Sequence, residues 1–284
     1  MKIAFVGLGV MGFPMAGHLK AAGHAVTVFN RSPDKAERWV ATHGGASAPS
    51  IAEAVVGAEM VVLCVGNDDD VRGVVAQILP ALAPGGVIVD HTTTSATVAR
   101  EMATAAGTVG CGFVDAPVSG GQAGAVSGQL TIMCGGDVAA YARVEPVLAV
   151  YAKAIRLMGP TGAGQLTKMC NQIAIAGVIQ GVAEALHFAK RAGLPTDDVL
   201  AAISKGAAQS WQMENRWATM AQGKFDFGFA VDWMRKDLGI ALAEAKVNGA
   251  RLEATALIDG FYEEVQAMGG HRWDTSSLVA RLEP

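Results

Sequence analysis

The sequence has few residues of the kinds that build metal centres or disulfide frameworks. It holds 4 cysteines and 6 histidines in 284 residues, and no two cysteines form a C-x-x-C pair. No histidine stands at ligand spacing from the cysteines, which are Cys64, Cys111, Cys134 and Cys170. We therefore expect neither a metal site nor a disulfide framework, and a reducing, cytoplasmic location.

The sequence also lacks an excess of positive charge. Its 22 lysines and arginines stand against 26 aspartates and glutamates, which gives a net charge of −4. Nucleic-acid grooves and membrane-surface patches depend on clustered basic residues, so we expect neither partner. No apolar run approaches the ~20 residues of a membrane span. These absences favour a globular protein with a small-molecule partner.

Short apolar runs alternate with helical pattern from the start of the chain to about residue 160. Such alternation predicts an α/β fold with a doubly wound, parallel, Rossmann-type sheet. The strands expected from apolar runs are Lys2–Val6, Ala25–Phe29, Met60–Val65, Val87–Asp90, Gly112–Asp115 and Leu130–Cys134.

The pattern becomes helical in the rest of the chain. A run without proline extends from Gly164 to Ala192, and further helices are expected at Thr196–Ser204, Gln212–Met220, Val231–Asn248 and Ala254–Met268. We predict a dinucleotide-binding domain at residues 1–162 and an all-helical substrate and oligomerisation domain at residues 163–284. The apolar run 166–192 is too long for one small domain to cover, which predicts a homodimer or homotetramer.

The motif Gly7-x-Gly9-x-x-Gly12 follows the first expected strand and opens a helical segment. In a dinucleotide-binding fold the first glycine permits a tight turn, the second admits the pyrophosphate and the third lets helix and strand pack closely. The motif predicts cofactor binding by Gly7, Leu8, Gly9, Val10, Met11 and Gly12. The alternative is a glycine-rich turn that binds something else, as in a methyltransferase.

The end of the second expected strand predicts which cofactor is bound. An acidic residue there would hydrogen-bond the ribose 2′-hydroxyl of NAD, but this sequence has the neutral Asn30. Arg31 and Ser32 follow and offer a guanidinium and a hydroxyl for a 2′-phosphate. We predict NADP as the cofactor, with NAD possible; the alternative is that Arg31 is a solvated turn residue.

Two later strand ends are expected beside the cofactor, because ligands of such sheets lie beyond the carboxyl ends of the strands. One supplies Val65, Gly66 and Asn67, and the other supplies three threonines, Thr92 to Thr94. A threonine hydroxyl there could reach the ribose or the nicotinamide. The alternative for the threonines is capping of the next helix.

Two further segments are candidates for substrate binding and catalysis. Ser119, Gly120 and Gly121 follow an apolar run, and their backbone N–H groups could hold a carboxylate; the alternative is a structural turn. Lys168, Asn171 and Gln172 share one face of the long helix. Carbonyl reduction needs a proton donor, and a partly desolvated lysine can serve. The alternative is a lysine on the solvated surface.

The chain closely resembles the β-hydroxyacid dehydrogenase family along its whole length. Four segments in order carry the resemblance: GLGVMGFPMAGHL, DAPVSGG, GPTGAGQLTKMCNQ and FDFGFAVDWMRKDLG. The resemblance implies an oxidoreductase with Lys168 as the catalytic acid/base, Ser119, Gly120 and Gly121 as the carboxylate loop, Asn171 as an orienting residue, Thr93 beside the cofactor and Lys236 near the nicotinamide. Without the resemblance, Lys236 could equally form an exposed charge pair with Asp237.

These observations predict hydride transfer between NADP(H) and a small β- or γ-hydroxy acid or its semialdehyde. Some family members carry Asn-Asn where this chain has Asn171-Gln172, so the substrate is left open. An NAD-preferring 3-hydroxyisobutyrate dehydrogenase is one alternative. A non-catalytic NADP-binding oligomeric module is the other, and the presence of Lys168 argues against it.

Overall fold

The computed structural model describes residues 1–283 and forms two compact units, which are Met1–Lys168 and the part of the chain from Met169 onward. The long helix α8, Ala163–Arg191, contributes its first residues to the first unit and the others to the second. The predicted domain boundary at residues 162/163 coincides with the start of this helix and stays a prediction.

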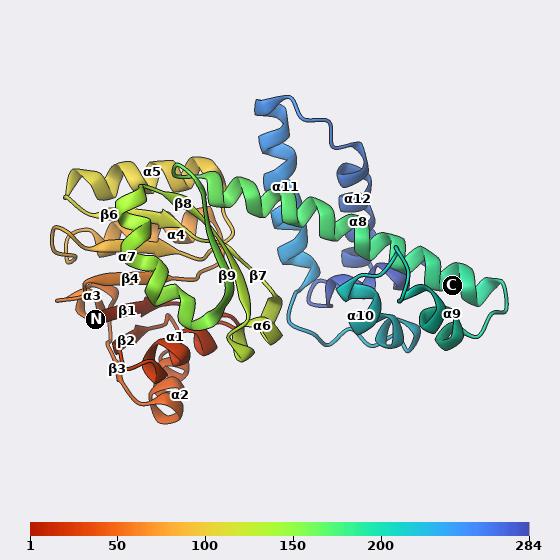
Figure 1. Ribbon diagram of the computed structural model, residues 1–284, viewed down its shortest axis with the longest axis horizontal. Coiled ribbons are helices and arrows are strands. Elements are labelled where there is room, and N and C mark those ends of the chain that lie inside the picture. Colours follow the sequence, from red (N-terminus) through yellow and green to blue (C-terminus); the bar gives the residue numbers. More distant parts are fainter. Residues whose placement is uncertain (284) are drawn as a thin grey trace. The chain divides into compact units, whose positions relative to one another are not determined.

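The first unit is built on one sheet in the strand order β3-β2-β1-β4-β5-β6-β8-β7, with β9 paired to β8 (Figure 1). Its strands are β1 Lys2–Val6, β2 Ala25–Phe29, β3 Ala46–Ser47, β4 Met60–Leu63, β5 Val87–Asp90, β6 Gly112–Asp115, β7 Val118–Ser119, β8 Leu130–Gly136 and β9 Ala152–Gly159. Strands β1 to β6 are parallel to one another. The expected Rossmann-type fold is therefore confirmed.

The sheet departs from the sequence prediction at one side. Strand β8 was expected to continue the parallel sheet, but it runs antiparallel to both β6 and β7. Strands β3, β7 and β9 were not predicted. Two of them have two residues each, which is too short for a periodic signal, and β9 carries charged and exposed residues among its apolar ones.

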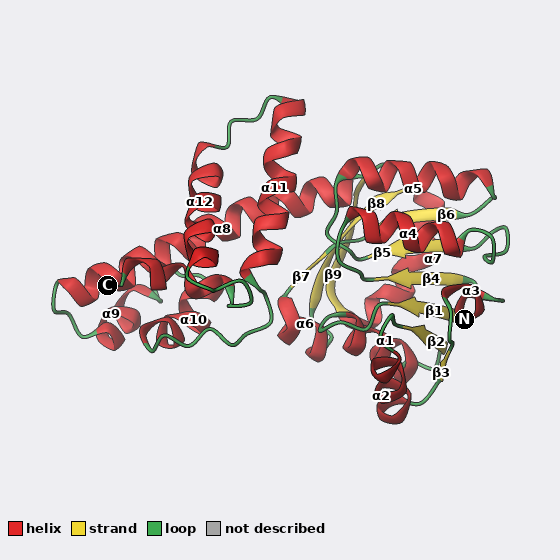
Figure 2. Cartoon of the chain, turned by 180° about the vertical axis from the view of Figure 1, so that it is seen from behind, coloured by secondary structure: helices red, strands yellow, loops and turns green. Residues whose placement is uncertain are grey.

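Helices cover both faces of this sheet, as Figure 2 shows. One face packs against α1 Gly12–Ala21, α2 Pro33–His43, α6 Gly121–Ser127 and α7 Val138–Leu148. The other packs against α3 Ile51–Val55, α4 Asp68–Ile78 and α5 Ala96–Thr108. In β1, Ile3 and Phe5 enter the first core while Ala4 and Val6 enter the second. This alternation explains why a central strand is apolar at every one of these positions.

The second unit is helical, as expected. It contains most of α8, then α9 Thr196–Ile203, α10 Trp211–Ala221, α11 Val231–Asn248 and α12 Glu253–Ala267, and ends in the 3-10 segment η2 Thr275–Leu282. A short 3-10 turn, η1 Ala149–Tyr151, belongs to the first unit. The hydrophobic core of this helical unit contains the buried rings of Trp217 and Tyr262.

Helix α8 corrects one sequence expectation. By length and composition it could cross a membrane, since an 18-residue window has a mean hydropathy of 1.3. The expectation that no apolar run approaches the length of a membrane span is therefore wrong for α8. However, Ala176, Ile179, Ala183 and Leu186 of this helix are buried in the core of the second unit. These contacts explain the apolar composition of α8 as that of a core helix.

Candidate active site

The glycine loop after β1 is tightly packed at two of its three glycines. Gly7 has a φ angle of +98°, and a Cβ atom there would collide with the carbonyl group of Cys64. A Cβ atom on Gly12 would collide with the carbonyl oxygen of Gly7 and lie 3.0 Å from the Phe5 ring. At Gly9 no atom lies within 4 Å of the corresponding position. The loop is therefore closed by its own packing except at Gly9, where a ligand can approach the backbone.

The start of α1 fits the phosphates of a dinucleotide. The helix begins at Gly12, and it has neither an acidic residue in its first turn nor a side-chain cap at Met11. The first N–H groups of a helix have no partners within it, and the helix dipole favours an anion there. Together with the open approach at Gly9, this arrangement suits a pyrophosphate.

The end of β2 holds the glycine loop in place. The Oδ1 atom of Asn30 accepts a hydrogen bond from the N–H of Leu8 at 2.9 Å, and its Nδ2–H donates to the carbonyl oxygen of Ser32 at 3.1 Å. Arg31 and Ser32 are exposed immediately before α2 begins at Pro33. Asn30 therefore organises the loop, whereas the Arg31 guanidinium is accessible to a ligand.

The end of β4 is joined to the loop after β5. The N–H of Val65 donates to the Oγ1 atom of Thr92 at 3.0 Å. Gly66 is half-buried, and the exposed Asn67 caps α4 by accepting a hydrogen bond from the N–H of Asp70 at 2.9 Å. The amide of Asn67, predicted to bind the cofactor, thus has a capping role in this structure.

The loop after β5 places Thr93 between two buried threonines. Thr92 is held from the β5 side, since its N–H donates to the Oδ1 atom of Asp90 at 2.8 Å. Thr93 itself is half-buried. The helix cap is Ser95, whose hydroxyl accepts a hydrogen bond from the N–H of Val98. The alternative role considered for the threonines, capping of this helix, therefore belongs to Ser95.

Asp115, at the end of β6, is a residue that the sequence reasoning did not single out. Its Oδ1 atom accepts from the N–H of Gly162 at 2.7 Å, and its Oδ2 atom accepts from the N–H of Gln165 at 2.9 Å. Burial raises the pKa of this carboxyl to about 6, although these hydrogen bonds act in the opposite direction. Asp115 thus anchors the start of α8. The only sequence signal was an aspartate at the end of an apolar strand.

The Ser119-Gly120-Gly121 segment joins β7 to the short helix α6. Gly120 and Gly121 have φ angles of +130° and +60°, which favour glycine at both positions. Ser119 is half-buried, and the two glycines are exposed. The segment therefore presents accessible backbone at a turn that other residues would strain.

Lys168 lies near the start of α8 and is 7% exposed. Lysines of this burial are rare unless a structural or chemical need keeps them inside. The alternative of a lysine on the solvated surface is therefore excluded.

The second unit contains a polar chain that links α8 to α11. Asn171 donates from Nδ2 to the Oε1 atom of Gln172 at 2.8 Å, and Gln172 donates from Nε2 to the Oδ2 atom of Asp237 at 2.7 Å. Lys236 pairs with the Oδ1 atom of Asp237 at 3.2 Å and lies 5.7 Å from the centre of the Trp233 ring. The charge pair between Lys236 and Asp237 is therefore present. It is not an exposed pair, because Asp237 is only 2% exposed. The role of Asp237 and the order of these hydrogen bonds could not be predicted from the sequence.

A buried histidine joins the loops after β5 and β6. His91 contacts the carbonyl oxygen of Ala116 through Nδ1 at 2.6 Å and the hydroxyl oxygen of Tyr151 through Nε2 at 2.8 Å. Because a carbonyl can only accept, Nδ1 carries the proton and the tyrosine hydroxyl donates to Nε2. Burial lowers the pKa of His91 to about 4, so the ring is neutral at neutral pH.

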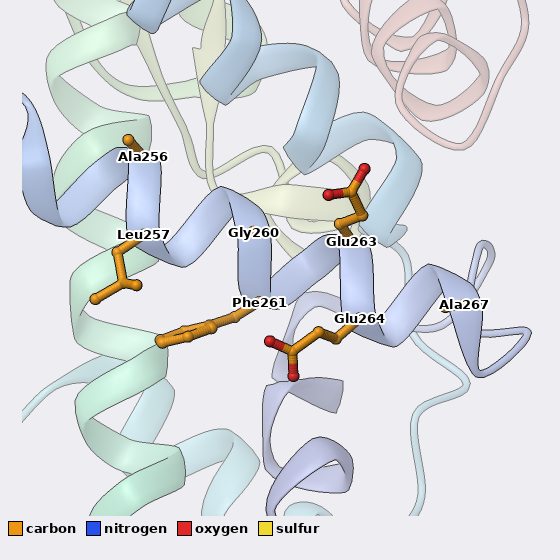
Figure 3. Close-up of a pocket in the computed structure, with 7 residues that line it drawn as sticks. All are labelled: Ala256, Leu257, Gly260, Phe261, Glu263, Glu264 and Ala267. Atoms are coloured by element: carbon orange, nitrogen blue, oxygen red, sulfur yellow. The ribbon is translucent and has the colours of Figure 1, made fainter.

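A surface hollow of about 450 Å³ lies along α12 in the second unit. Figure 3 shows the side chains of Leu257 and Phe261 next to each other on α12 and the carboxylates of Glu263 and Glu264 pointing away from each other. It contains no residue that the sequence predicted for cofactor, substrate or catalysis. Within residues 1–283, no group of three or more histidine, cysteine, aspartate or glutamate side chains is placed to hold a metal ion.

Comparison with protein families assigns both halves of the chain. Residues 2–159 match the NAD binding domain of 6-phosphogluconate dehydrogenase. Residues 162–282 match the family described as the NAD-binding domain of NADP-dependent 3-hydroxyisobutyrate dehydrogenase. The two matches together cover nearly the whole chain.

Individual proteins give the same likeness. The chain is 61% identical to an uncharacterized oxidoreductase of Shewanella frigidimarina, over 99% of this chain and 98% of that protein. It is 35% identical to the 2-hydroxy-3-oxopropionate reductase of Escherichia coli, over 100% of this chain and 97% of the reductase. A solved structure of the Mycobacterium tuberculosis 3-hydroxyisobutyrate dehydrogenase with L-serine has a TM-score of 0.90 and 34% identity, and the match covers 100% of this chain and 99% of that one. Each likeness extends over both units.

Proposed function

The chain belongs to the β-hydroxyacid dehydrogenase family, and on this premise we propose that it prefers NADP(H) and interconverts a small hydroxy acid with its semialdehyde or keto form. Family membership makes it an NAD(P)-dependent β-hydroxyacid dehydrogenase. Beyond family membership, we propose its cofactor preference, its proton donor and its substrate class. The observation that carries it is the burial of Lys168, at 7% exposure, on α8.

The preference for NADP rests on the end of β2. Asn30 is neutral and its amide is already bonded to the glycine loop, so no carboxylate repels a 2′-phosphate there. Arg31 is exposed beside it and can bind a phosphate through two N–H groups. A dianionic phosphate gains more from this site than a ribose hydroxyl does.

Lys168 is the proposed proton donor. When bound, the reduced cofactor supplies the hydride that adds to the carbonyl carbon of the substrate. Lys168 donates a proton from Nζ to the carbonyl oxygen as charge develops there, and the product leaves as the alcohol. In the oxidative direction the neutral amine accepts the hydroxyl proton. General acid catalysis of this kind contributes about 10²–10⁴-fold to the rate.

The substrate carboxylate is assigned to the Ser119-Gly120-Gly121 segment. Its exposed backbone can offer N–H groups, and Ser119 can add a hydroxyl. In the second unit Asn171 is the proposed substrate contact. The buried Gln172 fixes the amide of Asn171, and Asp237 in turn fixes Gln172. Lys236, paired with Asp237, is proposed to lie near the nicotinamide.

The proposal includes a cytoplasmic homodimer or homotetramer. Phe188 of α8 is 70% exposed and Leu257 of α12 is 60% exposed, so large apolar side chains of the second unit lack cover within one chain. Light scattering at micromolar concentration should give at least twice the mass of one chain. A monomeric mass would contradict this part of the proposal.

A spectrophotometric screen tests the reaction. NADPH oxidation is followed with glyoxylate, succinic semialdehyde, tartronate semialdehyde and methylmalonate semialdehyde, each repeated with NADH. We expect turnover with at least one of them and a higher kcat/KM with NADPH. NADPH binding without turnover on any member of the panel would instead support a non-catalytic NADP-binding module. Binding of S-adenosylmethionine without NADPH would support a methyltransferase.

A further inference from the structure

Gln165 holds the loop that contains Thr93 from both sides. Its Nε2–H donates to the carbonyl oxygen of Thr92 at 2.7 Å, and its Oε1 atom accepts from the N–H of Thr94 at 3.1 Å. These are the two peptide groups that flank Thr93. Gln165 is fully buried, and hydrogen bonds in such surroundings are stronger than in water. One side chain therefore fixes the backbone on either side of Thr93.

The backbone of Gln165 is itself fixed. Its N–H donates to the Oδ2 atom of Asp115 at 2.9 Å. The preceding Gly164 leaves no room for a side chain, because a Cβ atom there would collide with the carbonyl oxygen of Met133 and lie 2.8 Å from the Oδ2 atom of Asp115. The first turn of α8 is thus packed directly on the end of β6 and on the middle of β8.

Lys168 follows Gln165 by three residues on the same helix, so the two side chains lie on one side of α8 a turn apart. All the contacts involved belong to the first unit. We propose that Gln165 is a positioning residue, which sets the place of Thr93 relative to Lys168 and thereby relates the cofactor contact to the proton donor. This inference rests on the roles assigned to Thr93 and Lys168 in the proposed function.

The substitution Gln165→Met tests the proposal, because methionine has a similar length and volume but no amide. We expect NADPH to bind at least about tenfold more weakly in a fluorescence titration of the full chain. We also expect kcat on the best semialdehyde to fall by at least about tenfold, since small errors of placement reduce rates strongly. Thr167→Val is the matched control. It removes the 2.7 Å hydrogen bond from Thr167 to the carbonyl of Ala163 on the same helix and should change both values less than about twofold.

A double-substitution cycle separates positioning from general support of the fold. If Gln165 acts through Thr93, then Gln165→Met should have little further effect in a Thr93→Val background, so the two effects on NADPH binding are not additive. Additive effects, or NADPH binding by Gln165→Met within about twofold of the unsubstituted protein, would overturn the proposal.

Gln165→Glu provides a second variant if Gln165→Met does not fold. It retains an acceptor for Thr94 but places an oxygen opposite the carbonyl of Thr92, and the same weakening of NADPH binding is expected. The binding readout needs no turnover. A chain that binds NADPH but reduces no semialdehyde would refute the proposed reaction, and the effect of Gln165→Met on binding would still decide the role of Gln165.

Discussion

The Oδ1 atom of Asn30 lies 2.9 Å from the backbone nitrogen of Leu8 and accepts its hydrogen bond. This bond joins the end of β2 to the glycine loop, two segments that both contact the cofactor in a dinucleotide-binding fold. An aspartate at this position could also accept the bond from Leu8. The neutral amide therefore keeps the loop in place without bringing a negative charge to the side where a 2′-phosphate would bind.

The cofactor preference is expected to depend on Arg31. Arg31→Ala should raise the KM for NADPH far more than the KM for NADH, because in the proposed site the lost guanidinium would face a dianion in one cofactor and a hydroxyl in the other. Asn30→Asp should shift the ratio of kcat/KM values in the same direction, since it adds a negative charge while retaining the bond to Leu8. Equal effects of Arg31→Ala on the two cofactors would contradict the assignment.

Gly9 and Gly12 are expected to respond differently to alanine. Gly9→Ala should leave the melting temperature nearly unchanged, since no protein atom lies within 4 Å of the added Cβ atom, but it should weaken NADPH binding by about tenfold or more. Gly12→Ala should lower the free energy of unfolding by more than about 3 kcal/mol, because its Cβ atom would collide with the carbonyl of Gly7. Calorimetry measures the stability of each variant, and titration with NADPH measures its affinity for the cofactor. Unchanged NADPH affinity in Gly9→Ala would argue against the loop as the pyrophosphate site.

His91 should contribute a loss of stability in acid, opposite in direction to the contribution of Asp115, whose pKa burial raises to about 6. Burial lowers its pKa from 6.5 in the unfolded chain to about 4 in the folded protein, so the unfolded state binds more protons between these values. The contribution to stability is therefore complete above pH 6.5 and is lost as the pH falls toward 4, by on the order of 3 kcal/mol.

Urea unfolding at pH 7 and pH 5 measures the effect of His91. The loss of stability on acidification should be smaller in His91→Gln than in the unsubstituted protein. Tyr151→Phe, which retains the buried imidazole, should remain acid-sensitive. Equal losses in His91→Gln and the unsubstituted protein would show that other groups control acid unfolding.

The parts of the fold with strong local patterns could be predicted from the sequence. The apolar run of β1 predicted a strand, and the long run without proline predicted α8. The antiparallel direction of β8 could not be predicted, because an apolar run predicts a strand but not its direction relative to the neighbouring strand.

The contacts that support the candidate site were missed for a related reason. Asp115 reaches the backbone of Gly162, which is 47 residues later in the chain. Gln165 similarly contacts the peptide groups around Thr93, more than 70 residues earlier. Such bonds depend on the folded backbone and leave no periodic signal in the sequence. The roles of the individual site residues remain predictions, and the most informative of them concerns Lys168.

Lys168→Ala is expected to lower kcat by at least about a hundredfold, because the proton can no longer be delivered to the developing alkoxide. NADPH affinity should stay nearly unchanged, since the other parts of the cofactor are proposed to bind at the glycine loop and Arg31. Lys168→Arg should not restore turnover. Arginine keeps the positive charge but does not release a proton near neutral pH.

The most direct test of the proposed chemistry is therefore the kcat of Lys168→Ala on the best semialdehyde, measured at saturating NADPH beside the unsubstituted protein. A decrease of about a hundredfold or more with an unchanged dissociation constant for NADPH is the predicted result. Turnover near that of the unsubstituted protein would contradict the role of Lys168 as the proton donor, and Lys236 would then be the next residue to test.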